Sequence, residues 1–453
     1  MYDLVIKNGT VVTAEATFQA DVAIQGESIA AVGQDLRGSR EIDATSKLVT
    51  PGAIDVHVHM QMSLGGDVIS SDDFFTGTRA AALGGTTTII DFVEAAPEQS
   101  LLDGLADRRA EADPRVTIDY GLHMTIAPPD IAKLAELPAV VQAGCASFKL
   151  YMAYGFRLND GELLQALQGV KSVGGLPIVH AENWDVICTL IEQNLAAGRT
   201  EPRWHPRSRP APMEGEAAGR VIDIATLVGT PLYIFHVSTG EVVARMADAR
   251  RRGLPIMGET CPQYLTRDWS LFERPGVEGA LPVCSPPIRD AAEQPRLWDA
   301  LARDHLQVVS TDHCPFTREL KARGLGDFSK IPGGVPSIES RFSLVYSHGV
   351  GAGRISANRW VDVCCTTPAR LFGLTRKGVI APGFDADLVL FDPAREVTLS
   401  TDFLHENVDW TLYDGMRLTG WPAMTLSRGE IIADNGEFLG KSGRGRFIKR
   451  AFS

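Results

Sequence analysis

The stretch AIDVHVH, at residues 53–59, is the first of eight short apolar runs in the middle of this chain. The runs alternate with stretches of helical periodicity between residues 50 and 373, which is typical of repeated βα units around a parallel sheet. Eight is the strand number of a closed (β/α)8 barrel, so we predict an α/β protein of that fold class. The other seven runs are TTTIIDF (86–92), TIDYGLHM (117–124), ASFKLYM (146–152), LPIVHAE (176–182), PLYIFHV (231–237), LPIMGET (254–260) and LQVVSTD (306–312).

Both ends of the chain have a different pattern. Short runs in which apolar and polar residues alternate occur before residue 50 and return after residue 375, as in antiparallel strands with one face in water. We expect hairpin turns at Asn8-Gly9 and at Gly26-Glu27. The two ends are predicted to pair into one small β-sandwich beside the barrel. The predicted organisation is residues 1–50 and 374–440 for the β-sandwich, 51–373 for the catalytic barrel and 441–453 for a tail that contacts another subunit.

Composition narrows the class of partner. The 453 residues carry 44 Lys and Arg against 56 Asp and Glu, a net charge of −12. A negative net charge opposes binding to nucleic acid or to an anionic membrane. We therefore expect a small-molecule substrate, no nucleic acid partner and no membrane partner. The chain has no recognisable signal peptide and no uncharged apolar run of about 18 residues, which predicts a cytoplasmic protein. The seven cysteines lack CxxC spacing, which argues against disulfides and cysteine zinc sites.

Four histidines stand near the ends of the apolar runs, where barrel active sites are built. His57 and His59 are two residues apart, so on a strand both imidazoles leave the same face and can bind one metal ion. His180 and His236 each follow a run of apolar residues. One such histidine is most often a core residue, but four of them in one barrel favour a metal site.

Two charged residues extend this pattern. Lys149 lies inside an apolar strand, where an ammonium group is costly unless it is neutralised or paired. Its side chain either reaches the barrel mouth or, as a neutral amine, captures carbon dioxide as a carbamate that bridges two metals. Asp312 ends the eighth run, where a carboxylate binds a metal and accepts a proton, or instead caps the next helix.

Longer motifs make the chain closely similar to the cyclic amidohydrolases, specifically the dihydropyrimidinase and hydantoinase family. They are PGAIDVHVHMQ, DDFFTGTRAAALGGTTTIIDF, SFKLYMAY, VHAEN, HVS, ETCPQYL, SPPIR, DFSKIPGG and GRGRFIKR, and they extend over essentially the whole chain. The resemblance implies an amidohydrolase-type barrel beside a β-sandwich, in a homotetramer or homodimer. It also implies two Zn²⁺ per subunit, with Mn²⁺ or Co²⁺ as alternatives, bridged by an N6-carboxylated lysine.

The same resemblance assigns a role to each candidate residue. Asp312 doubles as the proton shuttle, and Tyr154 helps to polarise the scissile carbonyl and stabilise its oxyanion. The backbone of Ser285 holds the ring amides, and Gly333 stands where the family usually has an asparagine that contacts the substrate through its backbone. The metal ligands that it implies are His57 and His59 for the more buried ion, His180 and His236 for the other, Lys149 as the bridge, and Asp312.

The implied reaction is hydrolysis of the cyclic amide bond of a dihydropyrimidine or a 5-substituted hydantoin to the N-carbamoyl amino acid. Gly333 and Trp184 depart from the family pattern, which leaves the ring, its substituent and the stereochemical preference open. Dihydroorotases place an arginine just after HxH, where this chain has Met60 and Gln61, so a neutral substituent is expected. The alternatives are another cyclic amidohydrolase, allantoinase-like or dihydroorotase-like, and a non-catalytic dihydropyrimidinase-related structural protein. The complete set of metal-ligand residues disfavours the structural protein.

Overall fold

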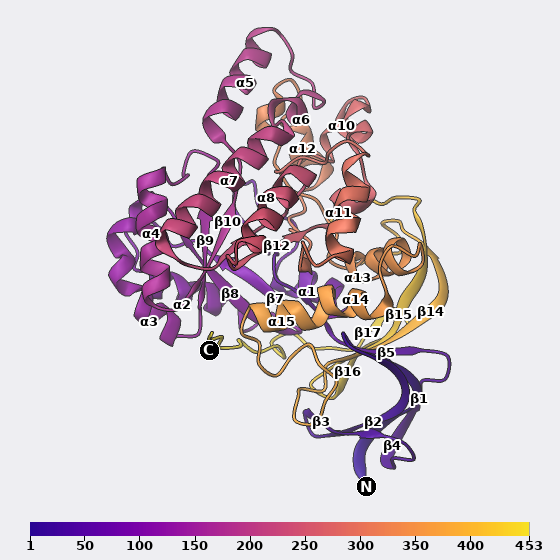
Figure 1. Cartoon of the computed structure of the whole chain (residues 1–453). Helices are drawn as coiled ribbons and strands as arrows, with labels where there is room; N and C mark the ends of the chain where they lie inside the picture. The colour runs from indigo at the N-terminus through magenta and orange to yellow at the C-terminus, as the bar shows by residue number, and fades with distance from the viewer. Residues whose placement is uncertain (453) are drawn as a thin grey trace.

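Eight parallel strands in the middle of the chain form the predicted barrel (Figure 1). The computed structural model describes residues 1–452. The strands pair in chain order, each with its neighbour in the sequence. An isolated bridge between Val58 and His313 closes the ring beyond the first and last strand. Each apolar run therefore contains one barrel strand, and the fold class is confirmed. The barrel strands are β6 Ala53–Asp55, β7 Thr86–Val93, β8 Asp119–Ile126, β9 Ser147–Tyr151, β10 Leu176–His180, β11 Leu232–Ile234, β12 Ile256–Thr260 and β13 Val308–Val309.

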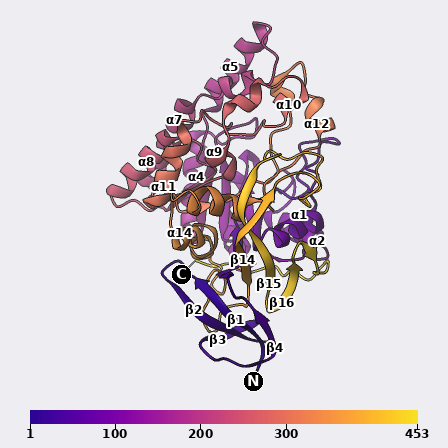
Figure 2. The ribbon, with the colours of Figure 1, turned by 90° about the vertical axis from the view of Figure 1, so that its right-hand side faces the viewer.

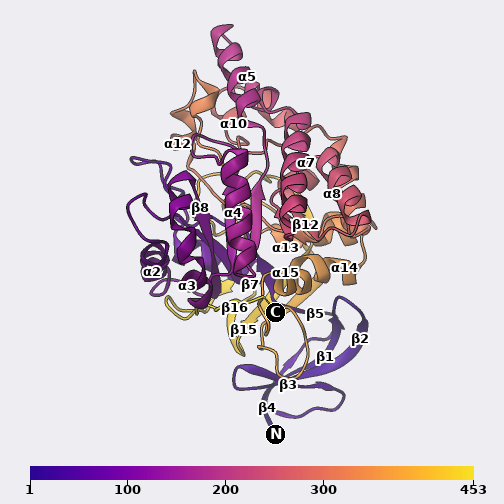
Figure 3. The same cartoon turned by 60° about the vertical axis from the view of Figure 1, so that its left-hand side comes forward.

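Helices cover the outside of the barrel. Figure 3 shows α4, α7 and α8 side by side along one flank, and Figure 1 shows α5 at the end of the molecule farthest from the N-terminus. Because the barrel strands are buried on both faces, their side chains and those of the helices form a common core. The α-helices are α1 Phe74–Leu83, α2 Leu101–Ala112, α3 Leu137–Gln142, α4 Asp160–Ser172, α5 Trp184–Ala196, α6 Trp204–Ser208, α7 Ala211–Val228, α8 Gly240–Arg251, α9 Pro262–Thr266, α10 Val277–Ala280, α11 Glu293–Ala302, α12 Arg318–Ala322, α13 Arg341–Val345, α14 Ala357–Val361 and α15 Thr367–Leu371. Short 3₁₀ and π segments are η1 Pro128–Glu136, η2 Trp269–Glu273, η3 Phe328–Lys330, η4 Tyr346–Val350 and η5 Asp362–Thr366.

Strands from both chain ends form a second, nine-stranded sheet, part of which projects below the barrel in Figure 2. Its strand β5 pairs in parallel with β1 and antiparallel with β14, and so joins the two ends. This confirms a small β domain built from both termini, whereas the exact domain boundaries stay a prediction. The strands are β1 Tyr2–Val12, β2 Thr17–Gln25, β3 Ser28–Gly33, β4 Gly38–Asp43, β5 Leu48–Pro51, β14 Leu388–Thr398, β15 Arg417–Ser427, β16 Glu430–Asp434 and β17 Glu437–Phe438.

The hairpin turn predicted at Asn8-Gly9 is wrong, because both residues lie inside β1. The register between β1 and β2 shifts at this point, so the two residues belong to a β-bulge. Asn8 has a φ of 60°, which asparagine tolerates better than most residues. A side chain at Gly9 would collide with Val49. The other expected turn, at Gly26-Glu27, does separate β2 from β3.

The C-terminal tail packs at the N-terminal end of the barrel beside β8. The N–H of Tyr120 donates to the carbonyl of Arg446 at 2.9 Å, and the N–H of Ile448 donates to the carbonyl of Tyr120 at 2.7 Å. Arg450 is only 1% exposed and its guanidinium donates to the carbonyl of Leu122. The tail is thus part of the barrel base, and its contact with another subunit stays a prediction.

Two expectations about the whole chain can be compared with the structure. The seven cysteines are all free, as their spacing predicted. Within residues 1–452 no helix combines the length and the apolar character needed to span a membrane.

Candidate metal centre

The predicted metal ligands converge at the C-terminal end of the barrel. Oδ1 of Asp312 lies 3.0 Å from Nε2 of His57 and 3.1 Å from Nε2 of His59. The two Nε2 atoms are 3.2 Å apart. His236 joins the group, since His57, His236 and Asp312 present ligand-type atoms that all lie within 4.8 Å of one another. These four side chains therefore face one small volume.

Closure of the barrel brings this group together. β6 ends at Asp55, so His57 and His59 lie beyond the strand and not inside it as predicted. Here a side chain replaces the backbone hydrogen bonds between strands. The carboxylate of Asp55 accepts hydrogen bonds from the N–H of Thr311 at 3.1 Å and from the Thr311 hydroxyl at 2.7 Å. The N–H of Asp312 then donates to the carbonyl of His57 at 2.9 Å. The two ends of the barrel are thereby held side by side at the ligands.

Three site residues have left-handed backbone conformations. The φ angles are 73° at Tyr154, 39° at His236 and 54° at Asp312. Such conformations cost about 1–3 kcal/mol in a non-glycine residue and concentrate at functional sites. β11 and β13 end earlier than predicted, at Ile234 and Val309, and the left-handed residues His236 and Asp312 follow them.

Glu259, near the end of β12, orients His57. Its Oε1 lies 2.7 Å from Nδ1 of His57, and its other oxygen accepts a hydrogen bond from the hydroxyl of Tyr233 at 2.9 Å. Burial works against a charged imidazole, but the carboxylates of Asp312 and Glu259 raise the pKa of His57. A carboxylate behind an imidazole fixes the ring and leaves the other nitrogen for a metal.

Glu182 has the same relation to His180. Its Oε2 lies 2.8 Å from Nε2 of His180 and 2.5 Å from Nη1 of Arg209. Burial opposes ionisation of this carboxyl, but Arg209 and then His180 lower the pKa of Glu182 to about 2. With Nε2 engaged, Nδ1 is the nitrogen of His180 that is left for a metal.

Lys149 is 1% exposed, in the middle of β9. Its Nζ lies 4.0 Å from the ring centroid of Phe235 and 4.8 Å from that of Tyr151. No ion pair joins it to another of residues 1–452, and burial lowers the pKa of Lys149 to about 7. The neutral amine is therefore well populated near neutral pH.

The residues present fit a transition metal such as zinc. Imidazole and carboxylate are typical zinc ligands, and the site also contains buried nitrogen without a partner. Nδ1 of His236 has no hydrogen bond within residues 1–452. Burial, with His180 and Lys149 nearby, lowers the pKa of His236 well below its usual value. The ring is thus neutral, which is the state that binds a cation.

The ligand cluster forms the floor of a cavity of about 720 Å³. Tyr154, Ser285 and Gly333 line the same cavity, so it is bordered by every site residue predicted from the sequence. The ring centroid of Tyr154 lies 5.2 Å from that of His180. Burial raises the pKa of Tyr154, so its hydroxyl stays protonated and can donate a hydrogen bond. The volume suits a small ring compound.

Sequence reasoning missed several residues of this site. Glu182 and Glu259 lie at the ends of apolar runs, which is the signal that identified Asp312, so the same rule would have found them. Arg209 lies in the loop between α6 and α7 and has no such signal. Its guanidinium carbon is 5.4 Å from the ring centroid of Trp184. Trp184 is a residue that departs from the family pattern, and it also lines the cavity.

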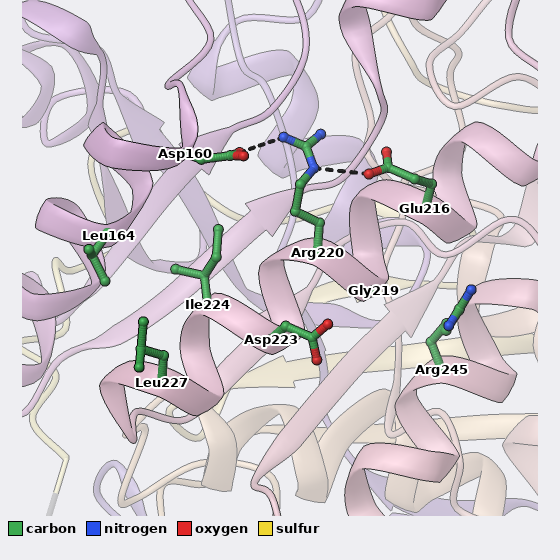
Figure 4. A pocket seen from close by; sticks show the side chains of 9 residues that line it. All are labelled: Asp160, Leu164, Glu216, Gly219, Arg220, Asp223, Ile224, Leu227 and Arg245. Atoms are coloured by element: carbon green, nitrogen blue, oxygen red, sulfur yellow. Dashed lines mark hydrogen bonds and ion pairs between the residues drawn. The ribbon is translucent and has the colours of Figure 1, made fainter.

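A second hollow, of about 460 Å³, lies outside the barrel between α4 and α7. Figure 4 shows Arg220 in this hollow between Asp160, at 2.5 Å, and Glu216, at 3.1 Å. These two carboxylates therefore pair with the charge of Arg220. None of the residues that line the hollow is a histidine or cysteine. The candidate metal site is therefore the one in the barrel cavity.

Comparisons with known proteins agree with this geometry. Residues 48–167 and 280–432 match the amidohydrolase family. The chain is 46% identical to the D-hydantoinase of Geobacillus stearothermophilus, over 98% of this chain and 96% of that protein. It is 42% identical to the D-phenylhydantoinase of Escherichia coli, over 99% of this chain and 98% of that protein.

The fold agrees equally well with a solved relative. The crystal structure of dihydropyrimidinase from Brevibacillus agri NCHU1002 matches with a TM-score of 0.97 and 45% identity, over 99% of this chain and 98% of that one. Both the barrel and the sheet of the two termini are included in a match of this length. The chain therefore belongs to the amidohydrolase family, in the group of cyclic amide hydrolases that contains the hydantoinases and dihydropyrimidinases.

Proposed function

We propose that this protein hydrolyses the cyclic amide bond of a dihydropyrimidine or a 5-substituted hydantoin and releases the N-carbamoyl amino acid. The main support is that the six proposed ligand residues, four histidines with Lys149 and Asp312, border a single cavity. Relatives named D-hydantoinase and dihydropyrimidinase, similar over nearly the whole chain, support the substrate class.

The proposed cofactor is a pair of Zn²⁺ ions, with Mn²⁺ or Co²⁺ as alternatives. When bound, the metal pair supplies Lewis acidity and lowers the pKa of water, so that hydroxide is available near neutral pH. The proposed ligands are His57, His59 and Asp312 for one ion, His180 and His236 for the other, and carboxylated Lys149 between them.

Lys149 fits the bridging role as a carbamate. Its neutral amine adds to carbon dioxide, a C–N bond forms and one amine proton leaves, so the product is an anion with two oxygens. Burial lowers the pKa of Lys149 to about 7 and so supplies the neutral amine. An anionic bridge offsets the repulsion between two dications.

The other residues of the cavity position the substrate and move a proton. Tyr154 donates a hydrogen bond to the carbonyl oxygen that becomes an oxyanion. Burial opposes ionisation of Asp312, but His57 holds the pKa of that carboxyl well below its usual value. Asp312 is therefore ionised near neutral pH, and we assign to this carboxylate the transfer of a proton from the attacking water to the departing ring nitrogen. The backbones of Ser285 and Gly333 hold the ring amides, and the cavity walls exclude bulk water.

A turnover panel tests the substrate class: dihydrouracil, dihydrothymine, hydantoin, phenylhydantoin, allantoin and dihydroorotate. We expect dihydrouracil or an apolar 5-substituted hydantoin to exceed dihydroorotate and allantoin in kcat/KM by at least about tenfold, or ~1.4 kcal/mol. Apolar Leu64 and Phe156 line the cavity, whereas Arg157 pairs with Asp185 at 2.5 Å and does not line it. An anionic substituent would therefore find no partner in these loops.

Other results of the panel would favour the rival functions. If dihydroorotate or allantoin is turned over faster than dihydrouracil and the apolar hydantoins, the proposed substrate class is wrong. The proposed metal chemistry is not affected by that result. Absence of turnover, combined with less than stoichiometric metal in the purified protein, would favour a non-catalytic structural protein.

Assembly and location form a separate proposal. We propose a homotetramer or homodimer in the cytoplasm, with the tail 441–453 at a subunit contact and no nucleic acid or membrane partner. The net charge of −12 and the seven free cysteines support this proposal. Light scattering of the purified protein measures the subunit count.

A further inference from the structure

The cavity contains two carboxylates that the proposed metal centre does not use. Glu94 directly follows β7, and Glu192 lies on α5, on the same face as Trp184 and Cys188. Within the described part of the chain, neither carboxylate forms an ion pair or a hydrogen bond with another residue.

The cations of the cavity wall, in contrast, are already paired. Arg209 contacts Glu182 at 2.5 Å, and Lys330 contacts Asp327 at 3.2 Å. Outside the ligand cluster, the unpaired charges of the lining are therefore both negative. A cavity with this charge balance favours a cationic ligand group and opposes an anionic one.

Glu94 is the carboxylate nearer in the fold to the metal ligands. It shares a wall with His59, Met62 and Ser63, because these four residues line both the main cavity and a smaller one of about 370 Å³ beside it. The strand that leads to Glu94, β7, pairs with β6, which leads to His59. A ring substituent that extends along this wall from the metal ligands meets the carboxylate of Glu94.

The surroundings of Glu94 leave its carboxylate available. The side chain of Glu94 is exposed, and the cation with the strongest influence on it is Arg108. Arg108 is itself engaged at 2.7 Å by Asp91 and at 2.7 Å by Glu111. The carboxylate of Glu94 is therefore open to a cationic group of a ligand in the cavity.

We propose that Glu94 is a specificity-determining residue that favours substrates whose ring substituent ends in an ammonium group. The corresponding class is the 5-(aminoalkyl)hydantoins, which yield N-carbamoyl derivatives of basic amino acids. Leu64 and Phe156 contact the methylene chain, and Glu94 binds the terminal charge. This inference rests on the proposed function and specifies the substrate class of the same site.

Three hydantoins of similar length test the inference: 5-(4-aminobutyl)hydantoin, 5-pentylhydantoin and 5-(3-carboxypropyl)hydantoin. Glu94→Gln is expected to lower the ratio of kcat/KM for aminobutyl over pentyl by about five- to tenfold, since it removes the charge and keeps the shape. Glu94→Asp is expected to retain most of the ratio. Glu94→Lys is expected to raise the ratio of carboxypropyl over pentyl.

Glu98→Gln is the matched control, because Glu98 is exposed on the same loop and lines neither cavity. It is expected to leave all the ratios unchanged. A Glu94→Gln ratio within twofold of the wild-type ratio, or a loss seen only in Glu192→Gln, would overturn the assignment to Glu94 while the proposed function stands. If the wild-type enzyme turns over dihydrouracil but none of the three hydantoins, this inference is contradicted and the proposed function stands. If it turns over neither dihydrouracil nor any hydantoin, both are contradicted.

Discussion

Burial sets the protonation state of the individual site residues. It lowers the pKa of Lys149 to about 7 and the pKa of His236 well below its usual value, and it raises the pKa of Tyr154. These shifts leave a neutral amine, a neutral imidazole and a protonated hydroxyl near neutral pH. Each is the state that the proposed chemistry needs.

Lys149→Ala is expected to abolish activity and tight binding of the second metal ion. The substitution removes the anionic bridge and leaves two dications that repel each other. Metal content and turnover measure the effect, and short carboxylic acids are expected to restore part of the activity. Lys441→Ala, at an exposed position, is the control. Full activity with two bound metals in Lys149→Ala would contradict the carbamate assignment.

Tyr154→Phe is expected to lower kcat by about 10² to 10³, the usual cost of losing one oxyanion donor. Metal content should not change, because the hydroxyl is not among the proposed ligands. Tyr346→Phe, outside the cavity, controls for the loss of a hydroxyl elsewhere. A kcat within about threefold of the wild-type value would show that Tyr154 does not stabilise the oxyanion.

Among the elements, the segment between β14 and β15 covers buried acids of the barrel. Oε1 of Glu406 accepts a hydrogen bond from the N–H of Glu339 at 3.2 Å and lies 3.8 Å from Nδ1 of His313. Its Oε2 has no partner among residues 1–452. Burial raises the pKa of Glu406 from 4.5 to about 7. This carboxyl therefore links the stability of the segment to pH.

The contribution of Glu406 to the free energy of unfolding is expected to fall as pH rises from 4.5 to about 7. In this range the unfolded chain has released the proton and the folded protein still binds it, so rising pH favours unfolding. The rise of this pKa from 4.5 to about 7 corresponds to about 3 kcal/mol, lost in full above the folded pKa.

Urea denaturation of the wild-type protein and of Glu406→Gln at pH 5 and pH 8 measures this contribution. Glu406→Gln should lose less stability between the two pH values, because glutamine does not titrate. Glu437→Gln, at an exposed position of β17, should behave as the wild type does. Equal losses in all three proteins would show that Glu406 titrates normally.

At the scale of the whole molecule, the two chain ends pair with each other and the C-terminal tail packs against the barrel. β5 and β14 join the ends in one sheet, and the tail places Arg450 under β8. Burial lowers the pKa of Arg450 to about 10, and no carboxylate of the described chain pairs with it. Carbonyls of the barrel base accept its hydrogen bonds, including that of Phe372 at 3.5 Å.

Arg450→Ala is expected to lower the free energy of unfolding by about 3 kcal/mol, because it leaves a cavity and unpaired carbonyls at the barrel base. Arg450→Met should cost less, since methionine fills the space without a buried charge. Urea denaturation measures both variants against Lys449→Ala, whose side chain is exposed. Equal stability of Arg450→Ala and Lys449→Ala would contradict a structural role of the tail.

The sequence by itself determined the eight strands and the type of site. Strands that are buried on both faces are mostly apolar, so they appear as near-continuous apolar runs that can be counted. A polar residue at the end of such a run needs a reason to be there, which is why His57, His180 and Asp312 could be proposed as candidate site residues without a structure. The long motifs added the family and its expected cofactors.

Only the tertiary structure decided how the barrel closes and how the ligands are oriented. Asp55 and Thr311 are 256 residues apart, and His57 and Glu259 are 202 apart. Their contacts nevertheless align His57 and His59 with Asp312. Local patterns also placed a turn at Asn8-Gly9, where contact with Val49 instead produces a bulge within β1. In each case the physical reason is the same: the energy comes from partners distant in the sequence, which no local periodicity encodes.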